Sequence, residues 1–358
     1  MKRSSVRTQR HRVVFGVGLL TAGVALAGCG AGSVETASTH DSGGVTVTNC
    51  RTEKTFPQPA EKIYVNESQM LSNLFALGAD DQIAAVSGLP HGKQEMMKDI
   101  YGERRIDSLP INSGEYATLE NVMAEQPDTM MAGFGWGYSV EDNLTPATLD
   151  KHGIPAYVST PTCRQDTGDA EGIMPPWKAI KTDIRNVGRI TGKQDQARST
   201  ITDIQQRLDR LHSAQHPDTA PTVFFFDLTG KAVMSAGKFS PAQAVIEAAG
   251  GTNALGEVDA DFTEVSWETL AAEQPDFFVI SDYGEGAQSF KRKVRSLKTN
   301  PATKDLPAVQ ESRFLRLPIQ MLLGTPLTID SAEHLRKSLE KWDLVPDSDI
   351  QPERDLNS

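Results

Sequence analysis

The most constraining feature of this 358-residue chain is a unit that occurs twice, once in each half. Residues 119–131 and 267–279 each read as a short helix with apolar residues at helical spacing, followed by Glu-Gln-Pro-Asp and a continuous apolar run. The proline ends the helix, because the residue before a proline is pushed out of the α region. An uninterrupted apolar run is typical of a strand buried on both faces of a parallel sheet. The repeat therefore predicts two similarly built α/β lobes.

Further short apolar runs, each followed by glycine, proline or polar residues, predict the remaining strands. They are residues 62–65, 83–87 and 154–159 in the first lobe, and 222–227, 232–235 and 313–317 in the second. Strands that alternate with helices imply open parallel sheets flanked by helices, with ligand chemistry in the loops at the carboxyl ends of the strands. The predicted fold is therefore α/β, with one such sheet at the centre of each lobe.

Between the lobes, residues 177–211 carry apolar side chains at steps of three and four, which predicts one-sided helices. Gly192 is expected to separate a short helix from a long one. We expect the long helix to join the lobes as a single rigid connection, and an ordinary surface helix is the alternative.

The first 28 residues are expected to be a sorting signal, because five basic residues precede an apolar run that is too short and glycine-rich to span a membrane. The run ends at Leu26-Ala27-Gly28-Cys29, which resembles the bacterial lipoprotein box. In that reading Cys29 carries a diacylglycerol with palmitate-type acyl chains, and the mature protein is anchored outside the cytoplasmic membrane. A secretory signal followed by a chance cysteine is the alternative.

These features predict six segments along the chain. They are a signal peptide at 1–28, a lipid-anchored flexible tether at 29–55, the first lobe at 56–176, linking helices at 177–214, the second lobe at 215–345 and a C-terminal tail at 346–358. The tether is expected because residues 30–48 are rich in Gly, Ser, Thr and Ala. Loss of the five basic residues of the signal takes the formal net charge from −11 to −16, which argues against nucleic acid as a partner.

If Cys29 is acylated, only two of the three cysteines remain. An exported protein lies in a compartment where disulfides persist, so Cys50 and Cys163 are predicted to form one. Two unrelated buried thiols are the alternative.

A set of short segments, in this order and spacing, carries a family resemblance. They are Pro59–Val65, Leu74–Gly78, the first repeat unit, Val187–Lys193, Ala248–Asn253, Val265–Glu268 and the second repeat unit. Over roughly residues 56–341 the chain resembles the ABC-transporter solute-binding proteins that carry iron-siderophores, haem and vitamin B12, and most of all the actinobacterial lipoproteins among them. The resemblance implies a monomer whose two lobes close modestly on a ligand held in the cleft between them.

The same resemblance implies a membrane permease with its ATPase as partner, and neither a cofactor nor a reaction. Family members usually place one glutamate on each lobe to meet arginines of the permease. Ser72 and Ala244 stand at those positions here. The nearby acids Glu67 and Glu247 are therefore the expected docking residues, and a different permease surface is the alternative.

Ligand contacts are expected from polar and aromatic residues that directly follow strands. The strongest group is the loop of Phe134, Trp136 and Tyr138, where glycines permit tight turns and the rings could stack on a chelate or macrocycle. Plain packing within the lobe is the alternative for these rings. The other candidates are Asn66, Glu67, Ser68, His91, Arg164, Lys238, Phe239, Asp282, Tyr283 and Gln320.

Among these candidates, Arg164 or Lys238 could offset the charge of an anionic chelate, although either could equally be an ordinary solvated side chain. Hydroxamate and catecholate siderophores, haem, cobalamin and a deazaflavin precursor all remain open as the ligand.

Two other classes of function compete with this interpretation. A zinc or manganese carrier needs about three histidines and a carboxylate, and of the histidines only His91 follows a strand, while His212 and His216 are four residues apart near a helix end. An extracytoplasmic enzyme is the second rival. The glycine-containing segments at 133–137 and 188–194 fit neither a dinucleotide fingerprint nor a phosphate loop, and no nucleophile elbow is present. No direct metal site and no catalytic residue are predicted.

Overall fold

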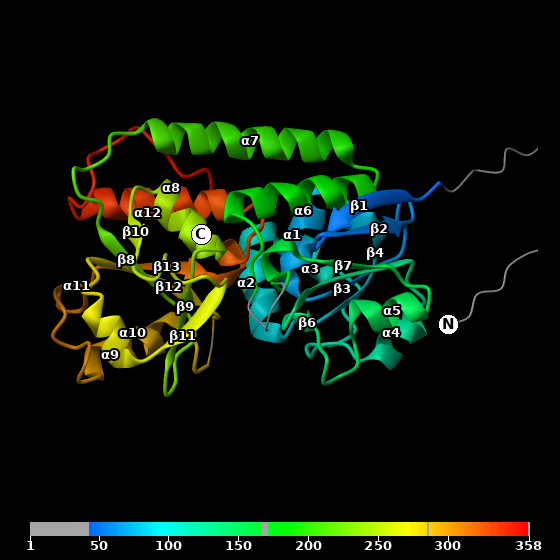
Figure 1. Cartoon of the computed structure of the whole chain (residues 1–358), viewed down its shortest axis with the longest axis horizontal. Helices are drawn as coiled ribbons and strands as arrows, with labels where there is room; N and C mark the ends of the chain where they lie inside the picture. The colour runs from blue at the N-terminus through cyan, green and yellow to red at the C-terminus, as the bar shows by residue number, and fades with distance from the viewer. Residues whose placement is uncertain (1–42, 166–170, 285, 357–358) are drawn as a thin grey trace, which may run out of the picture. The chain divides into compact units, whose positions relative to one another are not determined.

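The structure is a computed structural model that describes residues 43–165, 171–284 and 286–356 (Figure 1). The expected signal segment, the lipidation site Cys29 and the first part of the expected tether lie outside the described residues. The α/β architecture with parallel sheets flanked by helices is confirmed.

The first lobe is built on a parallel sheet in which β3 lies between β4 and β5, and β5 also pairs with β7 and the short β6. Alternate residues of β5 enter different cores: Met131 packs with α1 and α6, whereas Met130 and Ala132 pack with α4 and α5. This explains the continuous apolar run, because both faces of the strand are covered. The elements of this lobe are β3 (Ile63–Asn66), α1 (Ser68–Leu77), η1 (Asp80–Gln82), β4 (Ile83–Ser87), α2 (His91–Tyr101), α3 (Glu103–Asp107), α4 (Leu119–Glu125), β5 (Thr129–Phe134), β6 (Gly137–Tyr138), α5 (Pro146–Lys151), β7 (Ala156–Val158) and η2 (Thr160–Thr162).

The second lobe repeats this plan with a parallel sheet in the order β10-β8-β12-β13. A separate antiparallel pair, β9 with β11, lies beside it. Its elements are β8 (Thr222–Phe226), β9 (Val233–Ala236), α8 (Pro241–Ala248), β10 (Thr252–Asn253), β11 (Phe262–Val265), α9 (Trp267–Ala272), β12 (Phe277–Asp282), α10 (Phe290–Thr299), α11 (Pro307–Gln310), β13 (Phe314–Pro318), η3 (Ile319–Leu322) and α12 (Thr328–Lys341).

The repeated aspartate performs the same structural task in both lobes. Oδ2 of Asp128 accepts hydrogen bonds from the backbone N–H groups of residues 61 and 62, just before β3. Oδ2 of Asp276 accepts one from the N–H of Thr222, at the start of β8. Each aspartate therefore ties the strand that it precedes to the neighbouring strand, and the glutamine two residues earlier ends the helix in the left-handed region, with φ of 50° at Gln126 and 46° at Gln274. The predicted helix-turn-strand unit is confirmed in both halves.

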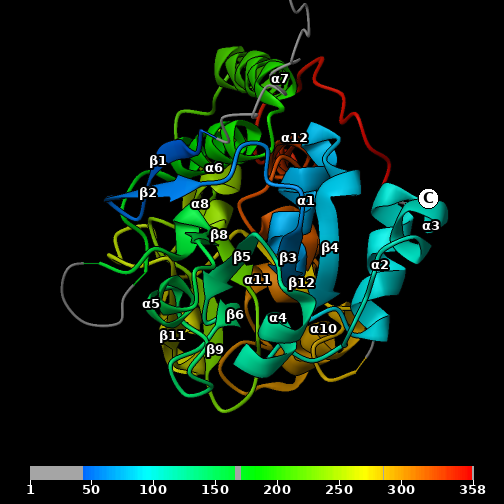
Figure 2. The same cartoon turned by 90° about the vertical axis from the view of Figure 1, so that its right-hand side faces the viewer.

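Two helices link the lobes, where the sequence led us to expect a single rigid one. α6 (Pro176–Ile190) and α7 (Gln194–Ser213) each contact α1 of the first lobe and α8 of the second. Both views show them side by side (Figures 1 and 2). The break falls at Gly192, as predicted. Gly188 permits the close approach, because a Cβ there would lie 2.5 Å from the Cβ of Ala197.

Asp183 joins α6 to the first lobe from inside the core. Its carboxylate accepts hydrogen bonds from the hydroxyl of Tyr157 at 2.6 Å and the backbone N–H of Thr160 at 3.0 Å. Burial nevertheless raises the pKa of Asp183 to about 6, against the lowering effect of these hydrogen bonds. These hydrogen bonds therefore fix α6 to β7 and η2 of the first lobe.

The last part of the expected tether is ordered structure, which corrects the sequence-based boundary. β1 (Val45–Asn49) and β2 (Thr52–Phe56) form an antiparallel hairpin that lies against α6 (Figure 2). Val45, Val47 and Asn49 are buried while Thr46 and Thr48 are exposed, a period-two pattern that the polar composition concealed.

The hairpin turn also carries the disulfide. Cys50 is bonded to Cys163, as predicted. The bond closes a loop with a sequence separation of 113, for which chain entropy gives on the order of 4–5 kcal/mol of stabilisation.

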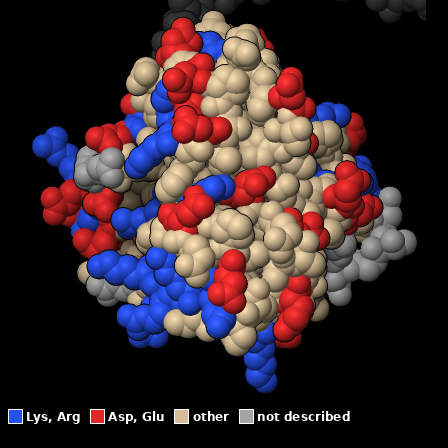
Figure 3. All heavy atoms as spheres, turned by 90° about the vertical axis from the view of Figure 1, so that its left-hand side faces the viewer, with Lys and Arg blue, Asp and Glu red and all other residues tan. Residues whose placement is uncertain are grey.

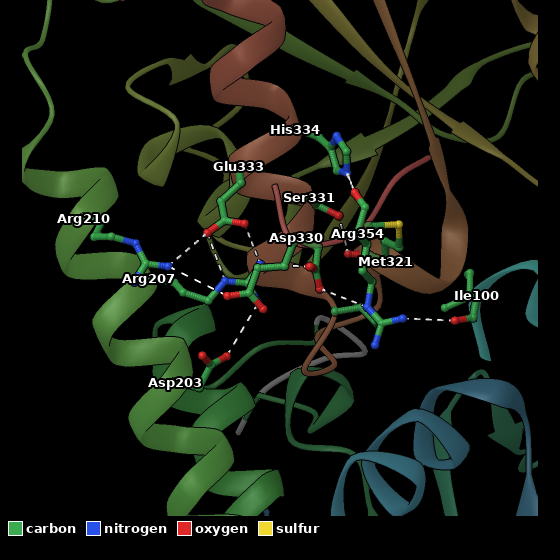
Figure 4. A network of polar contacts seen from close by, with 12 residues as sticks. Ile100, Asp203, Arg207, Arg210, Met321, Asp330, Ser331, Glu333, His334 and Arg354 are labelled. Atoms are coloured by element: carbon green, nitrogen blue, oxygen red, sulfur yellow. Dashed lines mark hydrogen bonds and ion pairs between the residues drawn. The ribbon is translucent and has the colours of Figure 1, made fainter. Parts of the chain in front are cut away.

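On the side of the molecule where α7 lies, α7 and α12 are joined by buried ion pairs, which we call the rear cluster (Figure 4). The Arg207 guanidinium lies 2.8 Å from Oδ1 of Asp330 and 2.6 Å from Oε2 of Glu333, and all three side chains are at most 5% exposed. The C-terminal segment, expected to be a tail, packs onto this region: Ile350 is buried, and Nη1 of Arg354 donates to the carbonyl of Ile100 on α2 at 3.0 Å. The segment thereby connects the second lobe to the first.

Candidate functional site

Loops that follow the strands of both sheets meet in a contact surface between the lobes, which we call the seam. The ring of Trp136 in the first lobe lies 6.3 Å from that of Phe262 in the second. Gln69 donates a side-chain hydrogen bond to the carbonyl of Leu323 across the same boundary. The residues that line the seam are Gln69, Trp136, Pro161, Thr162, Pro241, Asp261, Phe262 and Leu323.

The seam is closed in this structure. The cavity that its residues enclose measures about 10 Å³, which is close to the least that one water molecule needs. A chelate or macrocycle can enter only if the lobes separate or these side chains move. A larger cavity of about 490 Å³ lies to one side, between α2, β13, η3 and the C-terminal segment.

Asn66 holds the aromatic loop in place. Its Nδ2 donates to the carbonyl of Gly137 at 2.8 Å, and its Oδ1 accepts from the N–H of Ala117 at 3.1 Å. Gly137 has φ of +113°, and a Cβ there would lie 2.3 Å from the carbonyl oxygen of Asn66, so only glycine fits. Asn66 thus holds the loop in position, and both polar atoms of its amide are occupied by backbone groups.

The three rings of this loop have different fates. Trp136 reaches the seam, and Phe134 carries the Arg164 guanidinium over its face at 4.8 Å. Tyr138 is 1% exposed and its hydroxyl donates to the backbone carbonyls of Met130 and Tyr157. The sequence-based assignment of Tyr138 to the ligand is corrected here, because core packing and backbone hydrogen bonds already satisfy this side chain.

Two carboxylates meet at the seam, one from each lobe. The backbone N–H of Asp261 donates to the carbonyl of Glu171 at 3.0 Å. Burial raises the pKa of Glu171 to about 7, although the Arg164 charge acts in the opposite direction. Burial also raises the pKa of Asp261 well above its usual range, the Glu171 charge adds to this, and a hydrogen bond with Ser240 offsets part of it. Within the described residues, Oδ1 of the buried Asp261 has no hydrogen-bond partner.

Glu67 is the centre of a second polar group on the first lobe. Its carboxylate accepts hydrogen bonds from the Lys93 ammonium at 2.5 Å, the Ser68 hydroxyl at 2.7 Å and the N–H of Gln69 at 2.8 Å. Burial alone would raise the pKa of Glu67, but the Lys93 charge and these hydrogen bonds outweigh it and leave the pKa lowered. Glu67 is therefore an ionised, fully paired carboxylate.

A matching group lies on the second lobe. Oδ1 of Asp227 accepts hydrogen bonds from the hydroxyls of Ser281 at 2.6 Å and Tyr283 at 3.1 Å. The Lys293 ammonium lies 4.7 Å above the Tyr283 ring and donates to the Ser281 carbonyl. Burial lowers the pKa of Lys293 to about 8, against the opposing charge of Asp227. The negative charge of Glu67 on the first lobe also contributes to the raised pKa of Tyr283.

The remaining predicted residues lie at the margins. Asp282 is buried, accepts from the backbone N–H groups of residues 284 and 290, and lies 2.5 Å from Nε of Arg316. Lys238 is paired with Asp259 at 2.6 Å. Phe239 packs across the lobes against Gly172, where a Cβ would lie 2.3 Å from it. Both amide atoms of the buried Gln320 are without a hydrogen-bond partner within the described residues.

His91 is not part of the buried seam. Its imidazole is 87% exposed and lies 3.8 Å from Glu95 one helical turn further along α2. Within residues 43–165, 171–284 and 286–356, no three His, Cys, Asp or Glu side chains converge as metal ligands would. Over the same ranges, no helix combines the length and apolarity needed to cross a bilayer.

Several residues of the site escaped the sequence analysis, namely Lys93, Glu171, Asp227, Asp261, Phe262, Lys293 and Arg316. Asp227 is the last residue of the predicted strand 222–227, but β8 ends at Phe226, so Asp227 directly follows the strand as the other candidates do. Glu171 and Asp261 lie in irregular segments away from any predicted strand end, and no local signal marks them.

The expected docking acids differ in accessibility. Glu67 is 2% exposed and fully paired, so it is not presented to a partner, and this assignment is corrected. Ser72 and Ala244, at the positions of the family's usual glutamates, are buried as well. Glu247 lies exposed on α8, where it accepts a hydrogen bond from Gln243 at 2.7 Å.

A family model described as periplasmic binding protein matches residues 65–321, from β3 in the first lobe to η3 in the second. The chain belongs to this family. The match covers both sheets and the helical link, so the closed seam is the cleft between the two lobes of a solute-binding protein.

Individual relatives agree with this assignment. A vitamin B12-binding protein of Vibrio campbellii is 25% identical over 224 residues, which cover 62% of this chain and 71% of that protein. The structure of a periplasmic binding protein from Veillonella parvula superimposes with a TM-score of 0.68 at 19% identity, covering 83% of this chain and 98% of that one. An ABC-type Fe3+-hydroxamate transport system structure from Saccharomonospora viridis gives 0.67 at 23% identity, covering 82% and 98%.

Proposed function

We propose that the protein is the extracytoplasmic, lipid-anchored substrate-binding subunit of an ABC importer, which captures an iron-siderophore or a similar chelate or macrocycle, such as haem or a cobalamin. The observation that carries the proposal is the closed seam between two parallel-sheet lobes, inside the span of the family match. Relatives named for vitamin B12 and for Fe3+-hydroxamate support the choice of ligand type.

Capture in this account is binding without chemistry. The ligand enters when Trp136 and Phe262 move apart, and it is retained when the lobes close on it. Closure is favoured to the extent that the ligand binds the closed form more tightly than the open form. The two-helix link restricts the motion, because α6 and α7 each contact both lobes.

Delivery requires a permease and its ATPase. The lipid on Cys29 would keep the carrier at the membrane and raise the effective concentration of the permease. Glu247 on α8 is the docking acid that we retain from the sequence analysis, because it is exposed.

The experiment is a thermal melt of the full chain in detergent with ferric siderophores, haem, cyanocobalamin, a deazaflavin precursor, zinc and manganese. Ligand at a hundredfold excess over its Kd stabilises a protein by about 2.7 kcal/mol, which is roughly 5–10 °C here. A saturable shift with one chelate or macrocycle and none with free metal supports the proposal. A shift with zinc or manganese alone would replace it with metal-ion capture, and no shift with any compound would contradict it.

A further inference from the structure

At the cleft, the basic side chains are paired with acidic ones, and one further carboxyl group has no such partner within the described residues. Lys93 is paired with Glu67, Lys293 faces Asp227, and Arg316 is paired with Asp282. At the margin Lys238 is paired with Asp259, and Arg164 lowers the pKa of Glu171.

Asp261 is the carboxyl group that remains. It is 1% exposed, it lines the seam cavity, and its Oδ1 lacks a hydrogen-bond partner within the described residues. The nearest charge recorded for it is the Glu171 carboxylate, which has the same sign. A buried acceptor without a donor costs about 1–3 kcal/mol, and more when the group is charged. Any ligand that brings a donor or a positive charge to this point recovers that energy.

We propose that the seam selects a neutral or positively charged metal chelate whose periphery carries N–H or O–H donors, and that Asp261 is the residue that imposes this choice. The inference rests on the proposed function and specifies its ligand. Ferric trihydroxamates and cobalamins share this chemistry. Tri-anionic ferric catecholates and haem, with its two propionates, would bring further negative charge toward Asp261 and Glu171.

Further basic side chains of the second lobe lie outside the seam. Figure 3 shows Lys and Arg gathered toward the lower left of the end face of this lobe. The sequence of α10 includes Lys291, Arg292, Arg295 and Lys298. A separate hollow of about 520 Å³ is lined by Lys291, Arg292 and Arg316 together with Asp282. An anionic ligand would be drawn to this hollow and away from the seam.

The proposal also predicts how ligand affinity depends on pH. Because burial and the Glu171 charge hold the pKa of Asp261 high, its carboxyl group gains a proton readily while the seam is closed without a ligand. A bound cation favours the carboxylate and therefore displaces that proton. The affinity for a cationic chelate must then rise with pH, and binding must release protons. Ser240, Glu171 and, beyond it, Arg164 are the recorded groups that act on this site.

The test is calorimetric titration of the full chain with ferrioxamine B, a ferric trihydroxamate bearing one ammonium group, and with cyanocobalamin, ferric enterobactin and haemin. Each titration is repeated in two buffers of different ionisation enthalpy. We expect ferrioxamine B or cyanocobalamin to bind at least a hundredfold more tightly than either anionic compound. The tighter binder of these two shows whether the natural ligand is a ferric trihydroxamate or a cobalamin. Ferrioxamine B, if bound, should release protons, because its positive charge favours the ionised form of Asp261.

Asp261→Asn keeps the size of the side chain and removes the charge. It should weaken ferrioxamine B or cyanocobalamin binding about tenfold and reduce proton release, and Glu171→Gln should have a smaller effect in the same direction. Asp305→Asn, an acid of the second lobe that is 80% exposed and lies outside the seam, is the control and should leave affinity unchanged. Melting curves establish that each variant is folded.

Two outcomes separate the inference from the proposed function. If ferric enterobactin or haemin binds most tightly, or Asp261→Asn binds as the wild type does, the choice of ligand class is wrong while the importer function stands. In the first case Lys291→Ala with Arg292→Ala locates the ligand in the hollow beside α10. If none of the four compounds binds, both the proposed function and this inference are overturned.

Discussion

The rear cluster and the seam both bury carboxylates, yet they have opposite consequences. In the rear cluster Asp330 and Glu333 of α12 lie within 2.8 Å of the Arg207 guanidinium, which holds α7 and α12 together. At the seam Asp261 and Glu171 come from different lobes. Burial raises the pKa of both carboxyl groups, and the Glu171 charge raises the pKa of Asp261 further. The carboxylates of the rear cluster are thus neutralised by a cation, whereas the charge that acts on Asp261 is the like charge of Glu171.

The largest expected effect comes from breaking the rear cluster. Arg207→Ala leaves two buried carboxylates without their cation, which should lower the free energy of unfolding by about 3–5 kcal/mol. Urea denaturation measures this. Arg210→Ala is the control, because that side chain is 54% exposed and its loss should cost less than about 0.5 kcal/mol. Equal losses in the two variants would mean that the rear cluster does not hold the helices together.

The seam should respond to pH in the opposite sense from an ordinary ion pair. The pKa of Glu171 in the folded chain is about 7, above its usual value of 4.5, so the folded state binds the proton more tightly. Stability should therefore fall as pH rises from about 4.5 to 7 and stay level above that. Glu171→Gln removes this loss and should exceed the wild type by on the order of 1–2 kcal/mol at pH 8, with no difference at pH 4. If the free energy of unfolding varies with pH in the same way in both proteins, ionised Glu171 does not destabilise the folded state.

The C-terminal segment provides the smallest expected effect. Arg354 bridges from the rear cluster to the carbonyl of Ile100, and it is 46% exposed, so Arg354→Ala should cost less than about 1 kcal/mol of stability. It should nevertheless widen the interlobe distance distribution, measured between spin labels at Arg104→Cys on α3 and Arg295→Cys on α10. Lys341→Ala, an exposed change at the end of α12, is the control. An unchanged distribution would show that this contact does not restrain opening.

The sequence allowed the scaffold to be predicted because its signals are local. The two Gln-Pro-Asp units carry a helix end, a strand start and the aspartate that joins neighbouring strands in one short segment. The hairpin at residues 45–56 was missed because its alternation is confined to five residues in a Gly- and Thr-rich stretch. The composition of this stretch indicated a flexible tether, although the alternation of buried and exposed residues is that of a strand.

The site was less accessible to sequence reasoning, for a physical reason. Trp136 and Tyr283 follow strands and were found, but Tyr138 follows the same strand as Trp136 and turns into the core. Burial raises the pKa of both Asp261 and Glu171, and the Glu171 charge acts on Asp261 across 90 residues of chain that no local pattern connects. Residue type identified the candidates, and only the tertiary arrangement separated packing residues from cleft residues.

The most direct test of the account is hydrogen exchange of the full chain with and without the chelate that binds most tightly in the titrations. We predict that ligand protects backbone amides of residues 134–138, 259–263 and 283–284, on both sides of the seam, while α7 and α12 exchange as slowly with ligand as without it. Protection confined to the outer surface of either lobe, with the amides beside Trp136 and Phe262 unchanged, would contradict the assignment of the seam as the ligand site.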